Sequence, residues 1–540
     1  MSESKTKSVV KGALLLVLAN IVVKAIGVFY KIPLGNILGE DGMGYFSAAF
    51  EIHQLLLAIS TAGLPVALSK MISESYALGR YNEIRRIHKT TLIGFLIVGI
   101  ITTLLMYFGA GAFSSMINSS LAIYSIKALA PSVFFVVVIS IFRGYFQGLQ
   151  SMTPTASTQI VEAVIKLGVG IALALFLANL GYGQEFLSAG AIFGVTVSTF
   201  CAAIILIIVF ALSKQRKLIN SMPSEDNTSR SSKRILIDIV KIAVPVTAGS
   251  MVVNLTGFLD LFLIMNRLIQ SGMTEAAANA LYGTYKGFAQ TIFNLPPSII
   301  TSINVSIIPA IAAATTLKHV DRRKHLIESS LKIIILLSVP FAIGISMFSG
   351  PILAILYPMQ PQAAQMAAPL LSVLGIATIT VSVASLTTAI MQGMGKVVVP
   401  VLNLLVGGSI KLLCNYFLVG IPSIGIYGAP FGTNLCYLAT MILNLYFLSK
   451  YLDTRFNIYK IFVKPLFAGG IMGVSAYFVN KLLLLYMDTR LAFLLVVVFC
   501  VVIYAVLVFA LKIVEREDIL SMPLGKKLVK LTDKLKITRE

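Results

Sequence analysis

Long apolar segments follow one another along almost the whole chain, and short polar breaks separate them. Each apolar run holds roughly 20 residues or more, which is enough for a helix to cross a hydrocarbon layer about 30 Å thick. The pattern therefore predicts about fourteen transmembrane helices. They cover residues 12–34, 44–68, 90–112, 121–143, 155–178, 187–212, 237–265, 279–312, 327–349, 363–391, 397–418, 425–449, 461–481 and 490–512.

The composition agrees with an all-α integral membrane protein. Hydrophobic residues make up 57% of the 540 residues, charged residues only 12%, and the mean hydropathy is +0.90. So little polar surface cannot cover a water-soluble globule of this length. The formal net charge of +21 would suggest nucleic acid in a soluble protein, but most lysines and arginines fall in alternate loops. This asymmetry predicts a multi-pass protein of an inner or plasma membrane, with both termini cytoplasmic and no nucleic-acid partner.

Weak self-similarity indicates that the chain is duplicated. Phe146-Gln147-Gly148 matches Met391-Gln392-Gly393, Lys166 and Lys411 follow at the same offset, and Gly194 corresponds to Gly432. The order of the matches is collinear, so we expect two six-helix lobes related by a pseudo-twofold axis along the membrane normal, plus two C-terminal helices. The predicted domains are an N-terminal lobe (1–220), a cytoplasmic linker (221–236), a C-terminal lobe (237–450), helices thirteen and fourteen (451–513) and a cytoplasmic tail (514–540).

Four lysines fall at membrane depth: Lys24, Lys166, Lys286 and Lys411. Each costs about 2.5–3.5 kcal/mol at a helix centre, so we expect them to face a watery interior instead of lipid. Lys31 follows Lys24 by seven residues on nearly the same face, and Lys286 lies among small residues that permit close packing. Lys24, Lys31 and Lys286 could converge on one anion, although for Lys31 snorkelling to the interface is an equal alternative.

Acidic residues at similar depth are few. Glu162 is one helical turn from Lys166, so an intrahelical ion pair and a contact with substrate are both open. Lys411 has no such neighbour, and we expect Asp260 to supply its counter-charge from another helix. Glu51, with His53 beside it, could balance Lys31.

Signals for catalysis and metal binding are missing from the sequence. It contains no H-E-x-x-H, G-x-x-x-x-G-K-[ST] or G-x-S-x-G motif, and its four cysteines lie in apolar runs without C-x-x-C spacing. We therefore expect no enzyme, no cofactor and no metal site.

The C-terminal tail, residues 514–540, alternates leucines and lysines at helical spacing. This pattern is typical of a basic amphipathic helix on the inner membrane face, bound to anionic lipids. A regulatory contact is the alternative.

Three stretches resemble the multidrug/oligosaccharidyl-lipid/polysaccharide exporter superfamily, in its branch of SpoVB-, YtgP- and MurJ-type flippases of lipid-linked oligosaccharides. They are Gly63-Leu64-Pro65-Val66-Ala67-Leu68-Ser69-Lys70, Phe142-Arg143-Gly144-Tyr145-Phe146-Gln147-Gly148-Leu149-Gln150 with Pro154-Thr155-Ala156, and Asn254-Leu255-Thr256-Gly257-Phe258-Leu259-Asp260.

The resemblance implies a V-shaped pair of lobes, alternating access, and export of an undecaprenyl-diphosphate-linked sugar such as lipid II by a monomer. Lys24, Lys31 and Lys286 stand where the family's cationic cavity residues meet the diphosphate, and helices thirteen and fourteen would form a groove for the polyprenyl tail. Asp260 fits the sodium-coupling aspartate of some relatives. Lys411 and Asn415 depart from that site, which favours protons or the membrane potential as the driving force.

Two other functions compete with the flippase. A multidrug extruder of the same superfamily would need carboxylates in the cavity, whereas this sequence offers more lysines. A membrane glycosyltransferase would need a large external loop with catalytic carboxylates, and the predicted outer loops are short.

Overall fold

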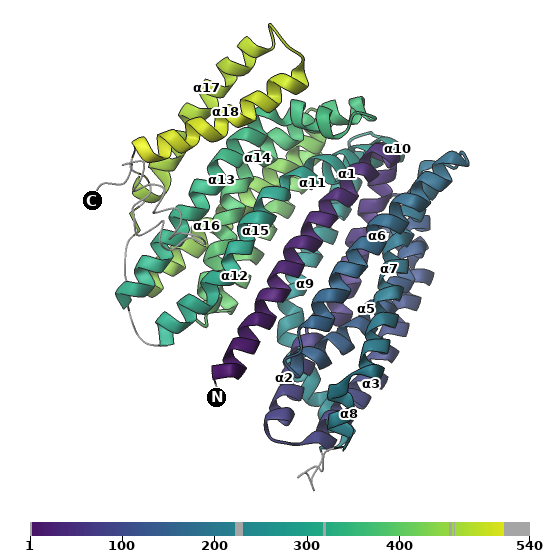
Figure 1. Ribbon diagram of the computed structural model, residues 1–540. Coiled ribbons are helices and arrows are strands. Elements are labelled where there is room, and N and C mark those ends of the chain that lie inside the picture. Colours follow the sequence, from purple (N-terminus) through teal and green to yellow (C-terminus); the bar gives the residue numbers. More distant parts are fainter. Residues whose placement is uncertain are drawn as a thin grey trace. The chain divides into compact units, whose positions relative to one another are not determined.

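The structure is a computed structural model, and it describes residues 3–221, 230–316, 320–452, 456–457, 459–511 and 513. Every regular element in these ranges is helical, which confirms the predicted all-α fold (Figure 1). The chain divides into two compact units, Met1–Gly287 and Phe288–Glu540.

In its described residues, the first unit contains ten α-helices and most of a π-helical turn. They are α1 (Glu3–Thr61), α2 (Leu64–Ala77), α3 (Tyr81–Phe108), α4 (Ala110–Met116), α5 (Ala122–Gly148), α6 (Thr153–Asn179), α7 (Gln184–Leu212), α8 (Lys214–Ser221), α9 (Ser232–Gln270), α10 (Glu275–Gly283) and the π turn η1 (Thr284–Ala289). The predicted boundary at the linker stays a prediction, and α9, which follows that linker, packs against α1, α2 and α3.

The second unit continues directly from η1. Its elements are α11 (Gln290–Phe293), α12 (Leu295–Thr316), α13 (Val320–Leu356), α14 (Pro361–Gly393), α15 (Val398–Cys414), the π turn η2 (Asn415–Val419), the 3-10 turn η3 (Gly425–Tyr427), α16 (Gly428–Leu452), the π turn η4 (Tyr459–Val463), α17 (Lys464–Leu483) and α18 (Thr489–Ala510). The tail at 514–540 lies outside the described residues.

Within the described ranges, twelve helical segments are long and apolar enough to cross a membrane. The first of them, Leu18–Ala77, holds two helices that meet at a kink at Gly39, inside the break that we predicted between residues 34 and 44. The ring centroids of Tyr30 and Phe46, one on each side of this kink, lie 6.2 Å apart. Only Gly39 leaves helical geometry there, at φ 61° and ψ −168°, a conformation that glycine adopts without steric cost. The predicted segment 279–312 is divided among α10, η1, α11 and α12. The multi-pass membrane fold is confirmed, while the count of fourteen stays a prediction.

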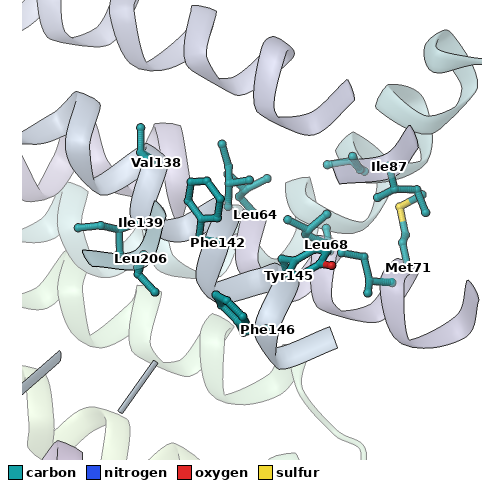
Figure 2. Packing of buried hydrophobic residues seen from close by; sticks show 14 of the residues in the cluster. Leu64, Leu68, Met71, Ile87, Val138, Ile139, Phe142, Tyr145, Phe146 and Leu206 are labelled. Carbon is teal, nitrogen blue, oxygen red and sulfur yellow. The ribbon is translucent and has the colours of Figure 1, made fainter. Parts of the chain in front are cut away.

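The core of the first unit lies where α2, α3, α5 and α7 meet (Figure 2). Leu64 and Leu68 of α2 pack in one cluster with Phe142 of α5 and Leu206 of α7, and all are buried. Pro65 occupies the first turn of α2, where its missing N–H is not needed. In the second unit, the corresponding core joins α13 and α14 to α17 and α18.

The repeated Phe146-Gln147-Gly148 and Met391-Gln392-Gly393 segments end their helices in the same way. In α5, the N–H of Ser151 donates to the carbonyl of Phe146, and the N–H of Gln150 donates to that of Gln147, both at 2.9 Å. The end of α14 repeats both bonds, from Lys396 to Met391 at 2.8 Å and from Gly395 to Gln392 at 2.9 Å. Both are Schellman motifs, with positive φ at Gln150 and Gly395.

Helix packing repeats as well. A side chain at Gly194 of α7 would come within 3.3 Å of the carbonyl of Lys166, and one at Gly432 of α16 within 3.2 Å of the carbonyl of Lys411. In each unit a glycine thus lets one helix approach the backbone of the preceding helix beside a lysine. These matching contacts support the predicted duplication.

Candidate functional site

The π turn η1 carries Lys286 into contact with two carboxylates. Its Nζ lies 3.0 Å from Oε1 of Glu51 on α1 and 3.3 Å from Oδ2 of Asp260 on α9. The side chains of Lys286 and Asp260 are 8% and 0% exposed, whereas that of Glu51 is 23% exposed. Lys31 is within electrostatic range of Glu51 and Lys286. We call Lys31, Glu51, Asp260 and Lys286 the charged cluster.

Small residues bring α10 and η1 close enough to α1 for these contacts. A Cβ atom on Gly283 would collide with the backbone carbonyl of Glu40, and one on Gly44 would lie 2.5 Å from the carbonyl of Asn279. The amide nitrogen of Asn279 donates to the carbonyl of Asp41 at 2.9 Å. The backbones of α1 and α10 are therefore in contact here, and Lys286 follows Gly283 by three residues.

Gly257 of α9 leaves the space that the carboxylate of Glu51 occupies. A Cβ atom at Gly257 would lie 2.6 Å from Oε2 of Glu51, closer than side-chain carbons are found to pack. Asp260 follows one helical turn later on the same helix. The Gly257-Phe258-Leu259-Asp260 stretch thus places one carboxylate and makes room for another.

The cluster contains as many positive as negative charges. Two ammonium groups and two carboxylates balance, which is the condition under which buried charges can be retained away from water. The hydroxyl of Tyr282 is also fully buried in electrostatic range of Lys286, Glu51 and Asp260, and it makes no hydrogen bond to the described residues. Sequence patterns alone gave no indication of this tyrosine.

Lys24 and Lys166 occupy different surroundings. The side chain of Lys24 is exposed on α1. Lys166 of α6 lies with its Nζ 5.5 Å from the centroid of the Tyr30 ring, and the hydroxyl of Tyr30 donates to the carbonyl of Ala191 at 2.9 Å. Of the three lysines expected to converge, the structure brings Lys31 and Lys286 together.

Glu162 forms its ion pair with Arg143, at 2.9 Å, and so joins α6 to α5. It also acts on Lys166 electrostatically, but the contact partner differs from the intrahelical pair that its spacing suggested. Arg143 belongs to the Phe142–Gln150 stretch that resembles the superfamily, and this stretch is the sequence signal that points to Arg143.

Lys411 and Asn415 lie in the second unit, at the end of α15 and the start of η2. Both are buried, at 9% and 0% exposure. In its own unit Asp260 contacts Lys286, and the predicted pairing of Asp260 with Lys411 stays a prediction. Lys286 and Asn415 each lie on a π turn, a form often found at functional sites.

An apolar groove opens in the second unit along α13, α17 and α18. Its volume is about 540 Å³. Its lining includes Pro340, Gly344 and Phe348 of α13, Met472 of α17 and Ala505 of α18. Two of these helices, α17 and α18, correspond to the predicted helices thirteen and fourteen, for which the resemblance implied a tail groove, whereas α13 corresponds to the predicted segment 327–349.

Comparison with known proteins places this architecture in a family. The polysaccharide biosynthesis protein family matches residues 9–315, and the MatE family matches residues 276–417. Stage V sporulation protein B of Bacillus subtilis (strain 168) is 26% identical over 422 residues, covering 78% of this chain and 79% of that protein. Lipid II flippase MurJ of the same organism is 25% identical over 493 residues, covering 88% and 89%.

Solved structures agree on the fold. A structure of lipid II flippase MurJ in an inward closed conformation superposes with a TM-score of 0.69, at 15% sequence identity, over 92% of this chain and 98% of that one. The chain is thus a multi-pass membrane protein that belongs to the polysaccharide biosynthesis protein family, within the multidrug/oligosaccharidyl-lipid/polysaccharide exporter superfamily and similar to its SpoVB and MurJ members.

Proposed function

We propose that this chain translocates a polyprenyl-diphosphate-linked oligosaccharide, lipid II or a related polysaccharide precursor, across the bacterial plasma membrane by alternating access. It would act as a monomeric transporter and not as an enzyme, with both termini in the cytoplasm. The observation that carries the proposal is the buried Lys286 ammonium, which contacts the carboxylates of Glu51 and Asp260. Such groups mark substrate pathways, because lipid gives them no stabilisation.

The chemistry of the substrate fits two features of the chain. An anionic diphosphate needs fixed cations, and Lys31 and Lys286 supply two in one cluster. A polyprenyl tail needs a long apolar surface, and the groove along α13, α17 and α18 is lined almost wholly by apolar side chains. The similarity to lipid II flippase MurJ of Bacillus subtilis supports the same class of substrate.

The direct test is rescue of a bacterium depleted of its lipid II flippase. We expect the wild-type chain to restore growth, and the triple variant Lys24→Gln, Lys31→Gln, Lys286→Gln to fail at equal membrane abundance. Growth of the triple variant at the wild-type rate would contradict the proposal that these lysines bind the diphosphate. Failure of the wild-type chain would point to another glycan.

The groove permits a separate test of tail binding. Ala505→Trp fills the space between α13 and α18, so we expect it to reduce rescue several-fold while the protein reaches the membrane normally. Val498→Trp is the matched control, because Val498 is 61% exposed and does not line the groove. Equal rescue by both tryptophan variants would show that transport does not require the groove.

Multidrug exchange is the second candidate. The MatE match and the two carboxylates of the charged cluster favour it, since carboxylates attract cationic drugs. Efflux of a cationic dye from cells that produce the chain, abolished by Glu51→Gln and Asp260→Asn but not by Lys31→Gln, would support this alternative.

A further inference from the structure

Glu51 occupies the position on Lys286 that a substrate anion would need. The carboxylate of Glu51 lies 3.0 Å from the Lys286 ammonium, and the carboxylate of Asp260 lies 3.3 Å from the same ammonium. One ammonium between two carboxylates leaves a local negative charge, which Lys31 balances electrostatically. A diphosphate could reach Lys286 in this arrangement only against repulsion, because it approaches two carboxylates of its own sign.

The two carboxylates differ in their freedom to leave. Asp260 is 0% exposed, and separating it from the ammonium would break a contact between two buried charges, which is strongly destabilising. Glu51 is 23% exposed, and its longer side chain can turn toward Lys31, with which it already interacts. Glu51 is therefore the group that can be exchanged.

The space beside Gly257 on α9 accommodates the carboxylate of Glu51. Gly257 leaves room for Oε2 of Glu51, and any side chain there would displace it. Tyr282 adds a buried hydroxyl that makes no hydrogen bond to the described residues. This hydroxyl could donate a hydrogen bond to an oxygen of an incoming phosphate.

We infer, on the basis of the proposed function, that Glu51 is an exchangeable counter-ion. It neutralises Lys286 when no substrate is bound, and it moves toward Lys31 when the phosphate of a polyprenyl lipid takes its place. Asp260 stays on Lys286 in both states. Glu51 is thus a positioning residue that sets affinity and allows release, because its return to Lys286 expels the anion.

The experiment measures binding of undecaprenyl diphosphate to the purified full chain in lipid nanodiscs, with undecaprenol as the uncharged reference. Glu51→Gln removes the competing charge but keeps a side chain of the same size. Gly257→Ala keeps Glu51 but fills the space that its carboxylate occupies. We expect each variant to bind the diphosphate lipid at least roughly tenfold more tightly than wild type, the size expected when one charge-assisted contact no longer competes. Binding of undecaprenol should not change.

Glu74→Gln is the matched control, since Glu74 is exposed and pairs with Lys70 on α2; it should bind like wild type. Unchanged or weaker binding in Glu51→Gln would overturn the exchange, and this variant decides the matter even if Gly257→Ala does not fold. If wild type and all variants fail to distinguish the diphosphate from undecaprenol, the proposed function itself fails. A purely structural role for Glu51 predicts loss of affinity, not gain.

Discussion

Lys286→Gln is expected to abolish rescue of a flippase-depleted strain and to lower the free energy of unfolding by about 3–5 kcal/mol, the usual cost of breaking a buried ion pair. Asp260 is 0% exposed and contacts Lys286 at 3.3 Å. Without the ammonium its charge would stay buried and would lose this contact. Thermal unfolding of the detergent-purified variant, together with its abundance in membranes, measures this loss.

The double variant Asp260→Asn, Lys286→Gln separates stability from transport. It also removes the buried charge of Asp260, so we expect most of the lost stability to return. Rescue should remain absent, because no cation is left at η1 to meet the anion. Growth at the wild-type rate would show that Lys286 serves only to hold the helices together.

Gly283→Ala is expected to be among the most damaging substitutions of a small residue in the chain. The added Cβ would collide with the carbonyl of Glu40, and backbone cannot move aside as a flexible side chain can. Overpacking usually costs 1–3 kcal/mol, and we expect about 3 kcal/mol here because α1 and α10 would have to separate. That separation also moves Lys286 away from Glu51.

Gly168→Ala on α6 is the control for this change. No atom lies within 4 Å of a Cβ built at Gly168, so the substitution should leave the unfolding temperature unchanged or slightly raised. Rescue assays of both alanine variants complete the comparison. Equal unfolding temperatures for the two would contradict the backbone contact between α1 and α10.

Much of the fold could be predicted because membrane helices follow from hydrophobicity alone. The break at Gly39 could be predicted too, because Gly39-Glu40-Asp41-Gly42 has the composition of a turn. In the structure two helices meet at a kink at this glycine. Composition indicates where the chain can turn, but it does not give the angle at which the two helices meet.

The sequence points to all four residues of the charged cluster as charges at membrane depth, but it does not give the contacts of Lys286 with Glu51 and Asp260. Lys286, Asp260 and Glu51 were recognised because charges at membrane depth are costly. Their partners depend on which helices adjoin and how each is rotated, and spacing along one helix does not report either. Glu162 illustrates this: Lys166 is one turn away, yet the ion pair is made across helices with Arg143.

The π turn at η1 has a consequence for how such sites arise. A π turn holds about one residue more than an α turn, and each residue of an α-helix rotates its successor by about 100°. The direction in which Lys286 faces therefore depends on a single extra residue in Thr284–Ala289. Gain or loss of one codon could turn this lysine toward the carboxylates or away from them, with every charged residue of the protein left unaltered.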